Sequence, residues 1–382
     1  MKSKPRVLID TFHLSNALTG IRTYTTQLCS GIEKRKFEEV DYLIYPNWNW
    51  LNQTMVLRGK VNVLKKILNH LLYFLWKQLC LPYLILFKRI DLIVSPDYLL
   101  PFIKFNSKSI AVFHDTFYWE LKENYNPLWR SYFLKSVRIG LNKNTGIVVT
   151  SSFIRNKVKE KLGGNYEISI VYQSPKMLAT VSNKLLNFEK IGIPENANYF
   201  LHVGVMDKRK NLGVLISAFR KVCEDEFFKD YYLVLIGSRA VTWFHDDFVN
   251  INKLIKRYKM QGKIIMPGFV SDADLSLIYQ KAFAYVFPSK EEGFGIPVLE
   301  AMKSNIPVVV SNQAALVEVA GDAALIFELN NTETLSEQMI RLKSFELRKS
   351  LVAKGKLRVQ KFTQSAFVNG FHKVVMEKIG VE

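Results

Sequence analysis

The sequence alternates short apolar runs with longer helical patterns, and this alternation constrains the fold more than any other feature. Six such runs lie in the first half of the chain: 6–10, 41–46, 91–96, 109–115, 146–152 and 168–173. Their Val and Ile content and their polar or Pro ends are typical of strands buried on both faces of a parallel sheet. Helical patterns such as 21–34 and 127–141 separate most of them, as in a doubly wound α/β sheet.

The same alternation starts again after an irregular stretch at 174–197, which contains Pro175 and Pro194. The second set of strand-like runs is 199–205, 231–237, 263–268, 283–289, 307–312 and 323–328. The helical patterns among them are 211–223, 248–259, 272–281, 297–304 and 333–344, and a basic helical tail follows at 345–380. A chain of 382 residues has the length of two domains. We therefore predict an α/β fold of two Rossmann-like domains that face each other across a cleft.

The domain boundaries follow from this pattern. We expect a first domain at 1–175, a linker at 176–197, a second domain at 198–358, and a C-terminal helix at 359–382 that packs back on the first domain. In doubly wound sheets, ligands bind beyond the carboxyl ends of the strands and at helix N-termini. The strand ends are therefore where we expect the chemistry.

The cysteines and the N-terminus indicate a cytoplasmic protein. Cys29, Cys80 and Cys223 form no C-x-x-C pair, so neither a disulfide framework nor a zinc site is indicated. The first residues, MKSKPRVLID, lead directly into a strand and lack the apolar core and cleavage site of a signal peptide.

The net charge of +19 is concentrated in the first half of the chain. Residues 1–190 hold 28 Lys and Arg against 13 Asp and Glu, and the remaining residues hold 25 against 21. Such a basic half indicates an anionic partner, such as a membrane surface, a nucleic acid or a polyphosphate. Nucleic acid is not expected, because the sequence contains no zinc-finger spacing, no RNP-like aromatic cluster and no basic helix with heptads.

Residues 63–81, VLKKILNHLLYFLWKQLCL, carry leucines at helical spacing interrupted by polar residues. The run fits an amphipathic helix on an anionic membrane surface, and it fits equally a core helix with a solvated basic face. A helix that spans the membrane is not expected, because His70 and Lys77 fall in the middle and Pro82 ends the run.

The run at 199–205 is followed by a basic turn, DKRKN, in the stretch GVMDKRKNLGVLISAF. Lys208, Arg209 and Lys210 form the turn, and Asn211 opens a helix. Cations beside the free N–H groups of a helix start suit a diphosphate. The alternative is an ordinary solvated turn.

The run at 283–289 leads into the stretch PSKEEGFGIPVLEAM. Gly293 and Gly295 allow the backbone to approach a ligand closely, and Pro297 suits the first turn of a helix. Glu292 and Glu300 flank the loop, and carboxylates accept hydrogen bonds from vicinal hydroxyls of a sugar or ribose. The alternative is that both acids stabilise a helix dipole.

Two loops of the first half also follow strands. Gly20 precedes a helix in LTGIRTYTTQL, and His114 and Asp115 follow a strand in FHDTFYW. A single His is usually a satisfied structural residue, but a place at the carboxyl edge favours a role in the site.

Neither a P-loop nor a G-x-G-x-x-G after the first strand is present, which excludes those two nucleotide motifs. The acids of SDAD at 271–274 are better explained by a helix cap, with Ser271 as N-cap, than by a metal site.

Four stretches together resemble the family-four retaining glycosyltransferases of GT-B fold: FPSKEEGFGIPVLEAM, GVMDKRKNL, GFVSDADLSLIY and NQAALVEVAGDAALIF. The resemblance runs through most of 199–328. It is looser in the first half, where it rests on TGIRTY, DLIVSPDYLLPF, VFHDTF and VVTSSFIRNKV. The RKN turn and Trp243, which follows LIGSRA, resemble the mannosyltransferase-like branch of O-antigen and capsule assembly.

The resemblance implies a role for each matching residue. Glu292 would contact hydroxyls of the donor sugar, Glu300 would bind the ribose, and His114 would lie near the reaction centre. Arg209 and Lys210 would neutralise the diphosphate leaving group. The remaining donor contacts would come from Gly20, Val270, Gly293, Phe294, Gly295 and Ile296.

The resemblance also implies the reaction. A hexose would pass from a GDP- or UDP-linked sugar, with GDP-mannose as the first expectation, to a lipid-linked oligosaccharide, with retention of anomeric configuration. No metal or other cofactor would be required, because cations and a helix N-terminus would stabilise the leaving group. The enzyme would be cytoplasmic and peripheral on the inner face of the membrane, held there by its basic first domain and residues 63–81.

The sequence departs from the family pattern in three segments. Arg22 stands where a second glycine is common and Thr23 where an arginine is common, which affects the expected phosphate contacts of the first loop. Val205 stands where many members have arginine, so Arg209 would carry more of the charge. Ser304 and Asn305 replace a small-Gly turn, and Asn tolerates the left-handed conformation.

Two other hypotheses fit the same composition. One is a sugar-nucleotide epimerase or phosphorylase on the same fold, although no lysine-bound cofactor site is evident. The other is a non-catalytic basic protein that binds nucleic acid or anionic lipid, which would leave the donor motif unexplained.

Overall fold

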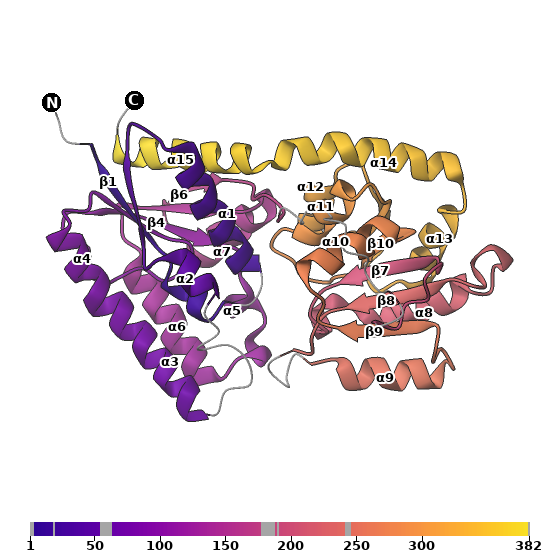
Figure 1. Cartoon of the computed structure of the whole chain (residues 1–382). Helices are drawn as coiled ribbons and strands as arrows, with labels where there is room; N and C mark the ends of the chain where they lie inside the picture. The colour runs from indigo at the N-terminus through magenta and orange to yellow at the C-terminus, as the bar shows by residue number, and fades with distance from the viewer. Residues whose placement is uncertain are drawn as a thin grey trace. The chain divides into compact units, whose positions relative to one another are not determined.

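The chain divides into two units, each built on a six-stranded parallel sheet (Figure 1). In this computed structural model, residues 4–17, 20–53, 63–176, 188, 191–240 and 246–380 are described. Unit 1 comprises Met1–Ser174 and Thr363–Glu382, and unit 2 comprises Pro175–Phe362. The first border is one residue from the expected one. The segment expected as a linker is grouped with unit 2, and the last helix joins unit 1 from Thr363 rather than from 359.

The sheet of unit 1 has the strand order β2-β1-β3-β4-β5-β6. Its strands lie within the six predicted runs: β1 (Arg6–Asp10), β2 (Asp41–Tyr45), β3 (Leu92–Ser95), β4 (Lys108–Phe113), β5 (Thr145–Val149) and β6 (Glu167–Ile170), give or take one residue. Every neighbouring pair is parallel. The apolar side chains of the central strands are fully buried, as the continuous apolar runs predicted.

Helices cover the sheet of unit 1, and the C-terminal helix is one of them (Figure 1). They are α1 (Gly20–Arg35), α2 (Trp48–Gln53), α5 (Phe117–Glu120), α6 (Pro127–Gly140), α7 (Ser152–Leu162) and α15 (Gln364–Ile379). Phe367 and Phe371 of α15 are buried in the same core as Val7 and Ile9 of β1. A Cβ on Gly31 of α1 would meet Val368 at 2.3 Å, so glycine allows α1 and α15 to pack closely.

The predicted end of the 63–81 helix at Pro82 was wrong. The helix runs from α3 (Val63–Leu75) through a π turn (Trp76–Cys80) into α4 (Leu81–Phe87), with Pro82 in the first turn of α4. A π turn changes the backbone hydrogen-bond spacing, which accommodates the missing N–H of proline without ending the helix.

One face of this helix packs on unit 1 and the other does not. Lys77, Leu81, Pro82 and Ile85 are buried. The exposed apolar side chains are Ile67, Leu68, Leu71, Leu72, Phe74, Leu79, Tyr83, Leu86 and Phe87. Ile67–Phe87 is also long and apolar enough to cross a membrane, a test that core helices of soluble proteins pass as well. Neither interpretation of the sequence describes this helix fully. Lys77 is buried, although a core helix was expected to carry a solvated basic face, and many of the apolar side chains are exposed.

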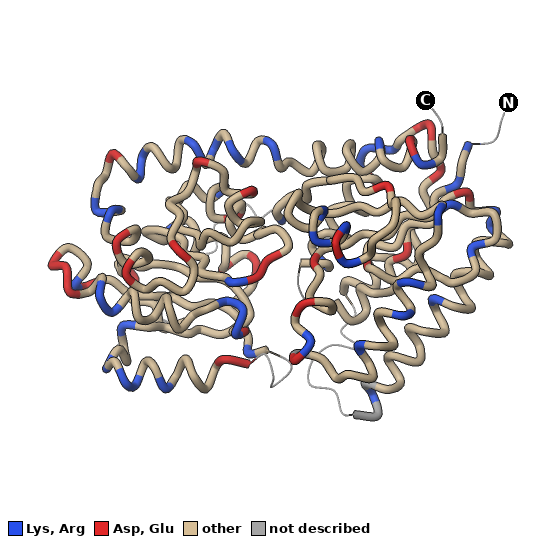
Figure 2. Tube along the Cα trace, turned by 180° about the vertical axis from the view of Figure 1, so that it is seen from behind, with Lys and Arg blue, Asp and Glu red and all other residues tan. Residues whose placement is uncertain are grey.

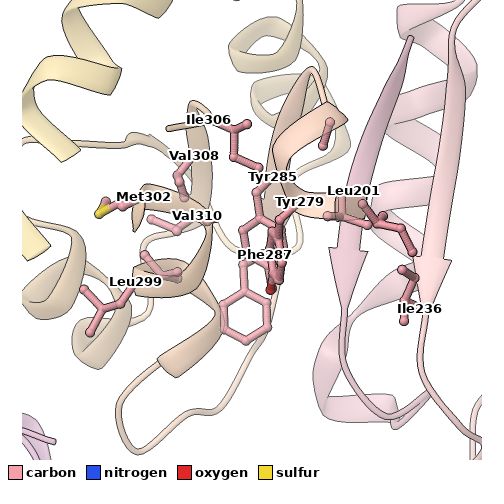
Figure 3. Packing of buried hydrophobic residues seen from close by; sticks show 14 of the residues in the cluster. Leu201, Ile236, Tyr279, Tyr285, Phe287, Leu299, Met302, Ile306, Val308 and Val310 are labelled. Carbon is pink, nitrogen blue, oxygen red and sulfur yellow. The ribbon is translucent and has the colours of Figure 1, made fainter. Parts of the chain in front are cut away.

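The sheet of unit 2 has the strand order β12-β11-β10-β7-β8-β9. Its strands are β7 (Tyr199–Val203), β8 (Tyr232–Ile236), β9 (Ile264–Gly268), β10 (Ala284–Phe287), β11 (Val308–Ser311) and β12 (Leu325–Phe327). The helices are α8 (Leu212–Val222), α9 (Phe248–Arg257), α10 (Asp272–Lys281), α11 (Ile296–Lys303), α12 (Ala314–Ala320), α13 (Thr332–Arg341) and α14 (Phe345–Val359). Figure 3 shows Leu299 and Met302 of α11 beside the strand residues Val308 and Val310, which anchors α11 against the sheet.

Candidate functional site

The site is built where the strand order of unit 2 reverses. From β7 the chain continues to β8 and β9 on one side, then returns to β10 on the other side of β7. Ligands of doubly wound sheets bind at such a switch point, outside the carboxyl ends of the two strands. Here those ends lead into the basic turn at 207–211 and the glycine-containing loop at 288–295.

Backbone bonds join the basic turn to the loop. The Arg209 carbonyl accepts a hydrogen bond from Lys290 N at 2.8 Å, and Ser289 Oγ lies 3.1 Å from the same carbonyl oxygen. Asp207 Oδ1 accepts from Arg209 N at 2.8 Å and caps the turn. Asn211 then adopts the left-handed conformation, with φ at 56°, and α8 begins after it. The two strand-end segments therefore form one structure.

Lys210 and Glu292 form an ion pair at the centre of this structure. Lys210 Nζ lies 2.6 Å from Glu292 Oε1, and Ser289 Oγ donates to the same oxygen at 2.8 Å. Burial raises the pKa of the Glu292 carboxyl, but the charges of Lys210 and Arg209 outweigh burial and hold it below its usual value. Glu292 is therefore an ionised acceptor at neutral pH.

Arg209 lies beside this pair. Its Nη1 donates to the Glu291 carbonyl at 3.2 Å, and its Nε lies 3.4 Å from Asp207 Oδ2. The structure thus brings Arg209, Lys210 and Glu292 together, and their assignment to a donor site stays a prediction.

The loop that follows presents its backbone at the start of α11. Gly295 has φ at 114°, and a Cβ there would meet Leu316 at 2.7 Å, so this position requires glycine. No side chain caps α11, and Pro297 lies in its first turn. The Phe294 ring is buried against Phe362, so only the Phe294 backbone can face a ligand.

Glu300 lies in a different environment from Glu292. It is buried in α11, and Tyr279 Oη donates to its Oε2 at 3.3 Å. Burial raises the pKa of Glu300 to about 7. At neutral pH this carboxyl can both donate and accept a hydrogen bond, whereas Glu292 only accepts.

His202 was missed by the sequence analysis. It lies in β7, fully buried, and its Nδ1–H donates to the Val286 carbonyl at 3.0 Å. Burial lowers its pKa to about 3, so the imidazole is neutral. Its ring stacks on Phe287, and Lys210 Nζ lies 4.7 Å from the centroid of the same Phe287 ring. A histidine inside the apolar run YFLHVGV was the available signal.

Of the remaining predicted residues, Ile296 is the first residue of α11, directly after Gly295, and the others lie elsewhere. Val270 is buried in the apolar core of unit 2, and Ile296 packs against that core. Gly20 begins α1 and His114 follows β4, both in unit 1. Trp243 lies outside the described residues.

His114 is held in one orientation. Its Nε2–H donates to the Pro96 carbonyl at 2.7 Å, and its ring meets the Tyr24 ring edge-on at 4.7 Å. Burial lowers the pKa of His114 to about 4. The ring is therefore neutral at pH 7, with a lone pair on Nδ1 that can accept a hydrogen bond.

Helix α10 begins at the predicted cap. Ser271 Oγ accepts from Asp274 N at 3.2 Å, which confirms the capping role of SDAD. Within the described ranges, no group of three or more His, Cys, Asp or Glu could hold a metal ion. That finding does not test how the reaction proceeds, so the metal-free mechanism stays a prediction.

Residues 183–358 match the family of glycosyl transferases group 1. The chain is 28% identical to the O-antigen chain mannosyltransferase B of Escherichia coli, over 94% of this chain and 96% of the relative. It is 26% identical to the O-antigen chain mannosyltransferase RfbU of Salmonella typhimurium, over 81% of this chain and 79% of that relative. The family match at 183–358 includes the basic turn, the loop and α11.

Solved structures share the fold. A glycosyltransferase from Rickettsia africae superposes with a TM-score of 0.71 at 18% identity, covering 98% of this chain and 99% of that one. WaaG, a glycosyltransferase involved in lipopolysaccharide biosynthesis, superposes with a TM-score of 0.68 at 14% identity, covering 97% of this chain and 99% of that one. These likenesses confirm the predicted α/β fold of GT-B type.

Proposed function

We propose that this chain, a glycosyltransferase whose residues 183–358 form a glycosyl transferases group 1 domain, moves mannose from GDP-mannose to a lipid-linked glycan in surface polysaccharide biosynthesis. The sugar and the pathway rest on the two O-antigen mannosyltransferases that the chain resembles along most of its length. The observation that carries the proposal is the Lys210–Glu292 pair beside Arg209, at the switch point of the unit 2 sheet.

The Lys210–Glu292 pair and the loop at 288–295 contact different parts of the donor. Lys210 has three N–H donors and uses one on Glu292, so others can reach a phosphate oxygen. Arg209 adds a second cation, and the uncapped start of α11 offers backbone donors. The ionised Glu292 accepts hydrogen bonds from sugar hydroxyls, and Glu300 binds the ribose.

The same groups supply the driving force for departure of the nucleoside diphosphate. Negative charge grows on the diphosphate in the transition state, where Arg209 and Lys210 stabilise it without a metal ion. The acceptor hydroxyl attacks on the face from which the diphosphate leaves, and the anomeric configuration is retained. For the two unit 1 residues we propose the roles that the sequence resemblance implies: His114, neutral and with Nδ1 as acceptor, orients a sugar hydroxyl, and the loop at Gly20 contacts phosphate.

The acceptor lipid places the enzyme on the inner face of the cytoplasmic membrane. No Asp or Glu occurs from 42 to 90, so α3 and α4 carry no red segment in Figure 2. The helix of α3 and α4 also has an exposed apolar face. Lys65, Lys88 and Arg89 are exposed near its two ends. An apolar face flanked by cations suits the boundary between acyl chains and anionic headgroups.

The test combines the purified protein with nucleotide sugars and a polyprenyl-diphosphate oligosaccharide. Transfer from GDP-mannose should be lost in Glu292→Ala and in Lys210→Gln. It should persist in Lys208→Gln, which removes a neighbouring exposed cation of the same turn. Undiminished transfer by Glu292→Ala would refute the site, and release of free sugar phosphate would favour a phosphorylase instead.

A further inference from the structure

The sheet of unit 1 has its own switch point, and a lysine occupies it. The order β2-β1-β3 places the reversal between β1, which ends at Asp10, and β3, which is followed by Pro96 and Asp97. Such a position commonly receives a ligand. Here it receives the side chain of Lys77, from the π turn between α3 and α4.

Lys77 is buried and fully engaged. Its Nζ lies 2.6 Å from Asp10 Oδ2 and 2.8 Å from Asp97 Oδ1, and both acids are buried too. The same Nζ donates to the Leu99 carbonyl at 2.7 Å and to Ser95 Oγ at 3.2 Å. Three of its four partners therefore belong to the segment 95–99.

Two neighbours on the same helix bind the same acids. Trp76 Nε1 donates to Asp10 Oδ1 at 2.9 Å, and Tyr73 Oη donates to Asp97 Oδ2. Tyr73, Trp76 and Lys77 stand at positions i, i+3 and i+4, so their side chains share the inward face of the helix.

The segment that Lys77 holds also holds His114. Pro96 lies between Ser95 and Asp97, and its carbonyl accepts the bond from His114 Nε2 at 2.7 Å. That bond keeps the proton on Nε2 and the lone pair on Nδ1. If Pro96 moved, His114 would lose the hydrogen bond that selects this tautomer, and only ring contacts such as that with Tyr24 would still orient it.

We propose that Lys77 is a positioning residue of the transfer reaction, which fixes the segment 95–99 and thereby the tautomer and direction of His114. The inference rests on the role proposed for His114. A buried ion pair is weak evidence for stability, because apolar replacements of such pairs are often equally stable. The bonds on both sides of Pro96 are what favour a positioning role over a purely structural one.

The experiment measures the His114 tautomer directly, without any substrate. Protein labelled with ¹⁵N-histidine is compared with His114→Gln to assign the ring signals by NMR. The wild type should contain the Nε2–H form. Lys77→Met should give a mixture of both tautomers. It should also lower kcat with GDP-mannose, on the order of tenfold to a hundredfold for a misplaced group, with little change in donor KM.

Tyr73→Phe tests the same idea with a milder change, and Tyr83→Phe is its matched control. The former removes only the bond to Asp97, and the latter removes a hydroxyl from the exposed face of the same helix. Tyr73→Phe should shift the tautomer in the same direction as Lys77→Met, and Tyr83→Phe should not.

A folded Lys77→Met protein with wild-type tautomer and kcat would overturn the proposal. If Lys77→Met does not fold, an unchanged tautomer in Tyr73→Phe would overturn it. Absence of transfer by the wild type with every nucleotide sugar would contradict the proposed function instead, because the tautomer measurement stands without activity.

Discussion

Lys210 Nζ lies 2.6 Å from Glu292 Oε1, and this ion pair joins the turn after β7 to the loop after β10. The two side chains are only 12% and 14% exposed, so their interaction is weakly screened by solvent. Ser289 donates to the same carboxylate oxygen. Glu292, which we propose accepts hydrogen bonds from the donor sugar, is therefore oriented by the protein itself, as expected of a preorganised site.

Separate substitutions of Glu292 and Lys210 should distinguish sugar binding from diphosphate binding. Glu292→Gln removes the charge that we propose accepts hydrogen bonds from sugar hydroxyls, so kcat/KM should fall about a hundredfold, a typical loss for one preorganised electrostatic contact. The affinity for GDP alone should change little. Lys210→Gln should weaken GDP binding as well, because it removes a diphosphate contact. Calorimetry with GDP and steady-state kinetics measure the two effects, and equal GDP affinities in both variants would contradict the division of roles.

Glu300 should make the stability of the protein depend on pH. Burial raises its pKa from 4.5 to about 7. The folded state therefore binds the Glu300 proton more tightly than the unfolded state. The stability that this proton contributes is complete below pH 4.5 and is lost as the pH rises through 7, by about 3 kcal/mol in total.

Glu300→Gln should remove this dependence, because glutamine stays neutral at every pH. Urea unfolding should find the variant similar to the wild type at pH 4.5 and more stable at pH 8. Glu346→Gln, an exposed acid of α14, serves as the control and should leave the profile unchanged. A constant difference between Glu300→Gln and the wild type across this range would refute the prediction.

Much of the fold could be predicted because both sheets are buried on both faces. Strands such as β1 and β8 are continuous apolar runs, and these can be recognised without knowledge of their neighbours. The same holds for the loop at 288–295 and the start of α11. Gly295 adopts a backbone conformation that favours glycine, and Pro297 suits the first turn of a helix, so both can be recognised locally. The strand order, and with it the position of the switch point, came from the structure, because it depends on which strands pair.

Features that depend on distant partners could not be predicted. Lys77 was interpreted as a solvated interruption of an apolar helix, because its partners Asp10 and Asp97 lie on other elements. Pro82 was interpreted as a helix end, because leucine periodicity carries no sign of a π turn. His202 was overlooked for the same reason, since its bond to Val286 crosses to a neighbouring strand.

Gly295→Ala should destabilise unit 2 and impair donor binding together. The φ of 114° is strained for alanine, and the added Cβ would meet Leu316 at 2.7 Å. Strain of this kind costs about 1–3 kcal/mol, and the loop backbone that we propose contacts the donor would shift with it. Thermal unfolding with and without GDP measures both effects. Gly370→Ala, in α15 where a Cβ has room, should be neutral or stabilising.

The apolar face of the α3–α4 helix should bind anionic vesicles. The double substitution Leu71→Ser with Leu79→Ser removes two exposed leucines of that face, so the protein should remain folded. Loss of this apolar area should weaken sedimentation with phosphatidylglycerol vesicles several-fold, since binding scales with the apolar area inserted. Leu128→Ser removes an even more exposed leucine from α6 and should have no effect. Equal losses in the double variant and in Leu128→Ser would show that exposed leucines in general, rather than this helix, mediate the binding.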